Sequence, residues 1–216
     1  MLKALVFDMD GVIIDSEPLQ AEIAVHVLKK LGGNPQPREF YEFIGVRNEE
    51  MWTILKERHN IKESVKEILE IHQDYKKKRF SEADVETVEG IPELIKEAKS
   101  RGLRIALATS SPRFLAEHIL KKFDLYKYFN VLVTADDITH SKPDPEIYIK
   151  AAQFLGVKPE ECIAIEDAHF GVKAAKAAGM KCIAYVNPNS GNQDLSEADC
   201  KVYSIKDIRL EEYLRQ

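Results

Sequence analysis

Four short fragments along the chain carry the side chains that could do chemistry. They are Asp8-Met-Asp10-Gly11, Thr109-Ser110-Ser111, Ser141-Lys142-Pro143-Asp144 and Glu166-Asp167. Each follows or closely trails a short apolar run of strand character, and the carboxyl ends of parallel strands meet at one edge of a sheet. Brought together there, the fragments would supply two pairs of carboxylates, hydroxyls and an ammonium group. That set of groups suits the handling of a phosphoryl group with a divalent cation.

The first fragment carries a pair of aspartates. Asp8 and Asp10 are two residues apart, so in an extended backbone both carboxylates point to the same side. One of them can attack phosphorus while the other serves the leaving or entering oxygen, and Gly11 lets the chain turn sharply afterwards. Taken alone, a loop aspartate pair with Asp10 as a turn former explains the same letters, because short motifs also match by chance.

The second fragment could form a cradle for phosphate. Thr109 ends an apolar run and precedes a helix expected to begin near Pro112. A hydroxyl and backbone N–H groups at such a point, here those of Thr109 and Ser110, can hold an anion. Helix capping by a hydroxyl residue is the commoner use of such residues, and both uses are compatible.

The third and fourth fragments add a cation and two acids. Lys142, fixed before Pro143, would neutralise a phosphate oxygen and the nucleophilic carboxylate together. Glu166 and Asp167 directly follow an apolar run, and carboxylates at a strand end suit Mg²⁺. Singly, a solvated loop lysine and acids at a helix start explain these residues as well. Because all four fragments occur at strand ends that one parallel sheet brings together, they favour a single active site.

The elements that must position these fragments alternate between strand and helix after residue 83. Strands are predicted at residues 2–7, 103–108, 131–134, 162–165 and 181–186, and helices at residues 91–101, 112–123, 145–155, 170–178 and 207–214. This alternation predicts right-handed βαβ units. The expected core is therefore an α/β fold with a Rossmann-like parallel sheet covered on both faces.

The stretch before residue 83 has a different pattern. Apolar residues recur at helical spacing in residues 19–31, 38–44, 49–58 and 63–80, and nothing there alternates like a strand. We therefore predict an inserted all-α helical cap, residues 16–82, and a discontinuous core of residues 1–15 and 83–216. Two crossings between them would let the cap swing over the sheet edge and exclude water.

The composition excludes several classes of protein. With 216 residues, 44% hydrophobic and 31% charged, the chain can form one buried core and a small accessory domain. A net charge of −5 argues against nucleic acid as a partner, and no apolar run is long enough to cross a bilayer. Cys162 and Cys182 lie in apolar runs as expected of buried thiols, and Asp8 comes too early for a signal peptide. We predict a cytoplasmic protein, monomeric because no exposed apolar stripe is evident.

On these residues the chain resembles the haloacid dehalogenase superfamily, in particular its phosphatase and phosphomutase branch with a helical cap after the first motif. The resemblance covers the whole length. It is carried by Asp8-Met-Asp10-Gly-Val, by Thr109, by Lys142 in Ser-Lys-Pro-Asp-Pro, and by Glu166-Asp167 with Gly171. Residues 11–19, GVIIDSEPL, are similar to the sugar-phosphate phosphatase and β-phosphoglucomutase-like group.

The resemblance implies a reaction. Asp8 would be the nucleophile that forms an aspartyl-phosphate, and Asp10 would be the general acid and then the general base. Thr109, Ser110 and Lys142 would hold the phosphoryl group, with Lys142 also counted as catalytic. The implied enzyme is a phosphoric monoester hydrolase that acts on a small phosphorylated sugar.

The resemblance also implies a metal. Mg²⁺, with Mn²⁺ or Co²⁺ as alternatives, would be bound by Asp8, by the carbonyl of Asp10 and by Asp167, with Glu166 assisting. The physical reason agrees, because positive charge offsets the repulsion between an anionic nucleophile and an anionic phosphate.

The choice between phosphatase and mutase depends on the cap. Mutases of this group resemble one another in carrying a histidine where this chain has Gln20, and cap Arg and Lys residues that grip a second phosphate. Arg47 is the nearest candidate here, although the alignment offset puts Asn48 at the mutase arginine. His72 and Lys76 are further candidates that are more simply explained as surface residues of a charged bundle. The balance favours a phosphatase, with a β-phosphoglucomutase-type mutase as the alternative.

Other classes stay open. A receiver-like phospho-acceptor domain uses the same groups on a parallel sheet but is a single compact domain that needs no helical insertion. A non-catalytic sugar-phosphate binding protein is the weaker option. A nicotinamide dehydrogenase is disfavoured because no G-x-G-x-x-G follows a strand, and Asp10 counts against dehalogenation.

Overall fold

The computed structural model describes residues 1–43, 46, 48–83 and 85–214. Within this part, six parallel strands form one sheet in the order β3-β2-β1-β4-β5-β6. The chain leaves β1 for β2 and β3 on one side and returns to β4 on the other, and ligands bind outside the carboxyl ends of strands at such a reversal. The strands are β1 (Ala4–Phe7), β2 (Arg104–Ala108), β3 (Val131–Val133), β4 (Cys162–Glu166), β5 (Lys181–Tyr185) and β6 (Cys200–Val202).

The α/β fold and its parallel sheet are as predicted, with two differences at the C-terminal end. The short edge strand β6 was not predicted, because three residues with the exposed Lys201 in the middle give little periodicity. The last helix is α8 (Leu210–Leu214), shorter than the predicted range of residues 207–214. Residues before it form a 3₁₀ turn, Ile205–Asp207.

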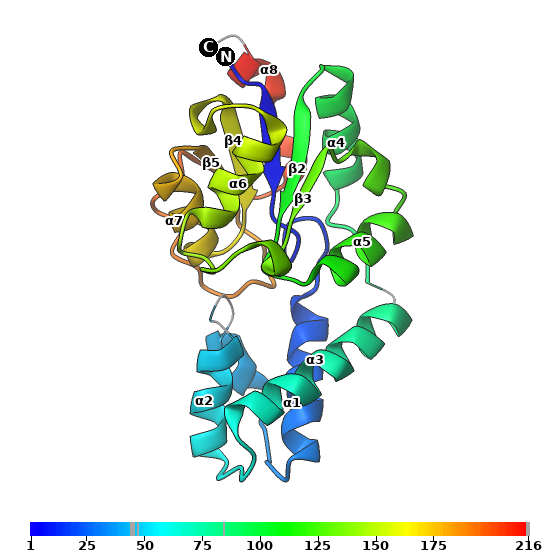
Figure 1. The fold of residues 1–216 in the computed structure, drawn as a ribbon, viewed down its shortest axis with the longest axis vertical. Coiled ribbons are helices and arrows are strands. Elements are labelled where there is room, and N and C mark those ends of the chain that lie inside the picture. The colour runs from blue at the N-terminus through cyan, green and yellow to red at the C-terminus, as the bar shows by residue number, and fades with distance from the viewer. Residues whose placement is uncertain (44–45, 47, 84, 215–216) are drawn as a thin grey trace.

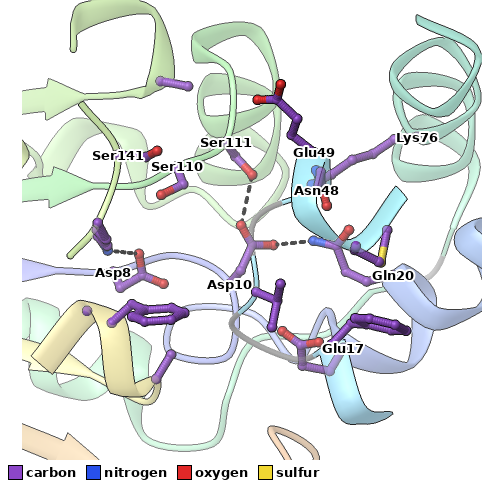
Figure 2. Close-up of a pocket in the computed structure, with 18 of the residues that line it drawn as sticks. Asp8, Asp10, Glu17, Gln20, Asn48, Glu49, Lys76, Ser110, Ser111 and Ser141 are labelled. Carbon is purple, nitrogen blue, oxygen red and sulfur yellow. Dashed lines mark hydrogen bonds and ion pairs between the residues drawn. The ribbon is translucent and has the colours of Figure 1, made fainter. Parts of the chain in front are cut away.

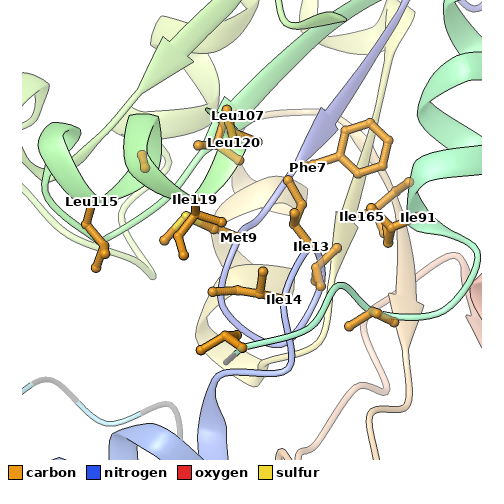
Figure 3. Packing of buried hydrophobic residues seen from close by; sticks show 14 of the residues in the cluster. Phe7, Met9, Ile13, Ile14, Ile91, Leu107, Leu115, Ile119, Leu120 and Ile165 are labelled. Atoms are coloured by element: carbon orange, nitrogen blue, oxygen red, sulfur yellow. The ribbon is translucent and has the colours of Figure 1, made fainter. Parts of the chain in front are cut away.

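The two faces of the sheet bury side chains of different size. In β1, Leu5 and Phe7 belong to one core cluster, whereas Ala4 and Val6 belong to the other. This alternation is the two-residue period of a strand buried on both faces. The larger side chains pack against α4 (Ile91–Ser100) and α5 (Arg113–Lys122), and the smaller ones against α6 (Glu146–Leu155) and α7 (His169–Ala177) (Figures 1 and 3).

Three α-helices lie together beyond the carboxyl edge of the sheet, at the bottom of Figure 1. The N-terminus and α8 lie at the opposite end of the molecule. The three are α1 (Glu17–Lys30), α2 (Asn48–Arg58) and α3 (Val65–Glu82), and the segment predicted as a helix at residues 38–44 is a 3₁₀ helix, Pro37–Phe43. The exact division into a cap of residues 16–82 and a discontinuous core stays a prediction. In the described chain, helices lack the combined length and apolarity that a membrane span requires.

Candidate active site

The turn after β1 holds two aspartates at the edge of the sheet. Met9, which lies between Asp8 and Asp10, is fully buried, and its carbonyl accepts a hydrogen bond of 2.8 Å from the N–H of Ile13. Figure 3 shows Met9 and Ile13 within the apolar cluster. Because the residue between them is anchored in the core, both aspartates remain on the side of the cavity, which they line. Gly11 completes the turn with a φ of +80°, a conformation that favours glycine.

Lys142 joins two of the predicted carboxylates. Its Nζ lies 2.6 Å from Asp8 Oδ1, 2.6 Å from Glu166 Oε1 and 3.0 Å from the carbonyl oxygen of Ala108. Burial raises the pKa of Asp8 to about 8, although the ammonium of Lys142 acts to lower that pKa. Burial acts to lower the pKa of Lys142, but the two carboxylates raise it above its usual range. The lysine is therefore held as a buried cation beside Asp8.

Asp10 is held from both sides of the cavity. Its Oδ2 accepts a hydrogen bond from Ser111 Oγ at 2.8 Å, and its Oδ1 accepts from Ser16 Oγ at 2.8 Å and from Gln20 Nε2 at 3.2 Å. Figure 2 shows Asp10 between Ser111 and Gln20. Ser16 begins α1 but makes no side-chain cap to it, since its hydroxyl is bound to Asp10. The carboxylate thus has a fixed orientation between sheet and helix.

The hydroxyl residues after β2 differ in their positions. Ser110 and Ser111 line the cavity. Thr109 is fully buried, and its Oγ1 accepts a hydrogen bond of 3.0 Å from the backbone N–H of Ser111. In this arrangement Thr109 shapes the turn while Ser110 is presented to the cavity.

Three buried carboxylates form a cluster that could hold a metal ion. One oxygen from each of Asp8, Glu166 and Asp167 lies within 4.8 Å of the others. Burial, followed by the charges of Glu166 and Asp8, raises the pKa of Asp167 well above its usual range. Glycines make room for the cluster, since a Cβ on Gly11 would lie 2.0 Å from Asp167 Oδ2 and one on Gly171 would lie 2.1 Å from Glu166 Oε1. Crowded oxygen donors with excess negative charge fit a hard divalent cation.

Several residues around this cluster were not predicted. Ser190 donates a hydrogen bond to Asp167 Oδ2, Tyr148 donates one to Glu166 Oε1, and Asn187 Nδ2 donates one of 2.8 Å to the carbonyl of Gly11. Asn187 and Ser190 follow β5. The expectation that site residues follow the carboxyl ends of strands, applied to β5 as to the other strands, would have included this loop. The sequence offered no such signal for Tyr148, which lies on α6.

A cavity of about 540 Å³ contains the site. The core contributes the aspartates, Ser110, Ser141 and Lys142. The helices beyond the sheet edge contribute His72 and also Gln20, Asn48, Glu49 and Lys76, which are labelled in Figure 2. The prediction that His72 is a surface residue is wrong, because the residue is only 3% exposed. Lys76, predicted in the same way, is half-buried. Arg47, the predicted cap residue, lies outside the described residues.

Comparison with known proteins identifies the family. The model of haloacid dehalogenase-like hydrolases matches residues 5–185. The chain belongs to this family. The resemblance drawn from the sequence is thereby confirmed, together with the prediction of a hydrolase.

Relatives of this haloacid dehalogenase-like hydrolase match nearly its whole length. A phosphorylated carbohydrates phosphatase of Thermotoga maritima is 39% identical over 183 residues, 84% of each chain. Hexitol phosphatase B of Escherichia coli is 32% identical over 225 residues, 99% of this chain and 97% of the relative. Among solved structures, a β-phosphoglucomutase from Clostridium difficile has a TM-score of 0.83 at 26% identity, covering 100% of this chain and 96% of the other.

Proposed function

We propose that this haloacid dehalogenase-like hydrolase is a Mg²⁺-dependent phosphatase of small phosphorylated sugars that works through an aspartyl-phosphate, an acyl phosphate formed on Asp8. The observation that carries the proposal is that Asp8 and Asp10 line one cavity. Asp8 Oδ1 lies 2.6 Å from Lys142 Nζ, and the carboxylate of Asp10 accepts three hydrogen bonds. The names of the two relatives, a phosphatase of phosphorylated carbohydrates and a hexitol phosphatase, support the substrate class.

The reaction consists of two displacements at phosphorus. A carboxylate oxygen of Asp8 attacks phosphorus, the bond from phosphorus to the sugar oxygen breaks, and that oxygen takes a proton from Asp10. Water then attacks the phosphorus bound to Asp8 and gives its proton to Asp10, and inorganic phosphate leaves with Asp8 restored. Covalent catalysis divides one difficult step into two easier ones.

Asp10 must be held in both of its protonation states during this cycle. Ser16 and Ser111 hold it through hydroxyl groups, and a hydroxyl can either donate or accept a hydrogen bond. The two serines can therefore bond the carboxylate and the protonated acid alike. Their placement suits a group that gives a proton in one step and takes it back in the next.

Positive charge at the site offsets the repulsion between the carboxylate of Asp8 and the anionic phosphate of the substrate. Lys142 and the hydroxyl and backbone groups of Ser110 would hold the phosphoryl oxygens, with Thr109 supporting that turn. Mg²⁺ would be held by Asp8, the carbonyl of Asp10, Glu166 and Asp167, and when bound it supplies charge neutralisation at the phosphoryl group. Mn²⁺ and Co²⁺ carry the same charge and stay alternatives.

A panel of phosphorylated sugars and hexitols, with phosphate release as the readout, tests the proposal. We expect turnover in Mg²⁺, loss of turnover in EDTA, and recovery when Mg²⁺ is restored. Rapid quenching followed by mass spectrometry should place a transient phosphate on Asp8. Absence of release from every phosphate ester in the panel would contradict the proposal. Persistent, stoichiometric phosphorylation without turnover would indicate the receiver-like class, and binding without either would indicate a sugar-phosphate binding protein.

A β-phosphoglucomutase-type reaction is the second candidate, supported by the similarity to the mutase structure. A mutase needs a cap that binds a second phosphate. Among the described cap residues that line the cavity, Lys76 is accompanied by the acids Glu17 and Glu49, and Gln20 stands where mutases carry histidine. That charge balance favours a phosphatase. Glucose 1-phosphate with catalytic bisphosphate decides the matter, since isomerisation faster than phosphate release would identify a mutase.

A further inference from the structure

A buried histidine in the wall of the cavity is fixed in one tautomer by a tryptophan. The indole Nε1 of Trp52, on α2, donates a hydrogen bond of 2.9 Å to Nδ1 of His72, on α3. The two rings pack edge to face with centroids 5.6 Å apart. Because an indole nitrogen can only donate, Nδ1 must be the acceptor, and the proton of the neutral imidazole sits on Nε2.

The surroundings keep this ring neutral. Burial, and then the nearby charge of Lys76, lowers the pKa of His72 to about 3. Trp52 is itself fully buried, so water does not replace it as the partner of Nδ1. At neutral pH the ring therefore offers one N–H donor, at Nε2.

That donor has no partner among the described residues. Nε2 of His72 is buried and makes no hydrogen bond. Leaving a buried donor unpaired is unfavourable, and native structures contain few such groups. His72 lines the cavity that contains Asp8 and Asp10, whereas Trp52 does not line it. Because Trp52 occupies Nδ1, Nε2 is the only polar atom that this ring can offer to a molecule in the cavity.

The chemistry of the donor limits what it can bind. A neutral N–H pairs with a hydroxyl, carbonyl or ring oxygen and offers no charge to offset a second phosphate. Glu17 and Glu49 line the same cavity, and carboxylates accept hydrogen bonds from hydroxyl groups. This wall suits the uncharged, oxygen-rich end of a substrate whose phosphate lies at Asp8.

We propose that His72 Nε2–H recognises an oxygen on the carbon skeleton of the substrate, so that the enzyme selects phosphorylated sugars or polyols long enough to reach α3. The inference rests on the proposed function for the position of the phosphate. It adds a specificity-determining residue and a lower limit on substrate length.

Two substitutions separate the two edges of the ring. His72→Asn keeps an oxygen near the position of Nδ1 for Trp52 but removes the distal donor. His72→Gln keeps an N–H near the position of Nε2 but removes the acceptor for Trp52. We expect His72→Asn to lower the ratio of kcat/KM for sorbitol 6-phosphate to kcat/KM for acetyl phosphate about tenfold, mainly through KM. His72→Gln should preserve most of that ratio and instead unfold at lower denaturant concentration.

A retained kcat/KM ratio in His72→Asn would overturn the inference. If His72 served only as the partner of Trp52, His72→Asn would keep the ratio and His72→Gln would lose stability with no separate effect on specificity. Calorimetric binding of sorbitol 6-phosphate in the Asp8→Asn background separates this inference from the proposed function. Weaker binding in Asp8→Asn/His72→Asn than in Asp8→Asn/His72→Gln supports recognition by His72 even if the wild type releases no phosphate. Equal binding in the two double variants refutes it.

Discussion

The two sides of the cavity differ in how their polar groups are satisfied. On the side of the sheet, Lys142 binds Asp8 and Glu166, and Ser190 binds Asp167, so the charged groups have partners before any substrate arrives. On the side of α2 and α3, the Nε2 donor of His72 is buried without a partner among the described residues. Figure 2 shows the two sides facing each other across Asp10.

The difference separates chemistry from recognition. A charge that must stabilise a transition state works best when it is already fixed, because no reorganisation is then needed during reaction. A group that selects a substrate gains most when the substrate supplies its missing partner, since a molecule lacking that oxygen leaves a buried donor unpaired. We therefore expect substitutions on the side of the sheet, the sheet side, to lower kcat. Substitutions on the side of the helices beyond the sheet edge, the cap side, should raise KM.

Asp8→Asn should give the largest effect. The amide cannot act as the nucleophile, so we expect phosphate release to fall by about 10⁴-fold or more, with the fold retained by circular dichroism. Asp124→Asn is the matched control, because Asp124 is exposed with a φ of 56°, which asparagine also adopts. Substantial residual activity in Asp8→Asn would refute Asp8 as the nucleophile.

Lys142→Met should damage both activity and stability. It removes the cation between Asp8 and Glu166 and leaves buried carboxylates unpaired, so we expect kcat to fall about 10³-fold. The free energy of unfolding in denaturant should fall by about 3–5 kcal/mol. Lys206→Met, which removes the exposed ion pair with Glu89, should change neither measurement much. Equal effects in the two variants would show that the buried ion pairs of Lys142 contribute no more than an exposed ion pair.

The buried imidazole on the cap side predicts a dependence of stability on pH. Below its ordinary pKa of 6.5, His72 takes up a proton in the unfolded chain but not in the folded chain, where burial lowers its pKa to about 3. Stability present above pH 6.5 is therefore lost as pH falls through the window from 6.5 to 3. Between pH 7 and pH 5 the wild type should lose about 2 kcal/mol more than His72→Asn in denaturant unfolding. Parallel pH curves for the two proteins would contradict a neutral, buried His72.

Gln20→Ala should give the smallest effect and tests a residue of α1 that contacts Asp10. It removes the 3.2 Å hydrogen bond to Asp10 Oδ1, while Ser16 and Ser111 continue to hold that carboxylate. We expect kcat to fall about fivefold with little change in KM. Gln153→Ala, on the exposed face of α6, is the control. A change confined to KM would instead assign Gln20 to substrate binding.

Much of the sheet side could be predicted because its information is local. Asp8 and Thr109 directly follow buried strands and Glu166 ends one, which is visible within a few letters. Parallel strands bring their carboxyl ends to one edge. The cap side could be predicted only as helices. Helical periodicity gives a buried face but not the residues on another helix that will meet it.

The amino-acid pattern was enough to predict five strands of the parallel α/β sheet, the strand ends that carry the candidate site and the family of the chain. The tertiary structure alone decided that Ser16 binds Asp10 rather than capping α1, that Ser190 supports Asp167, and that His72 is buried against Trp52. The physical reason is the range of the interactions involved. Backbone pattern follows from neighbours along the chain, whereas hydrogen bonds between side chains depend on how separate elements pack.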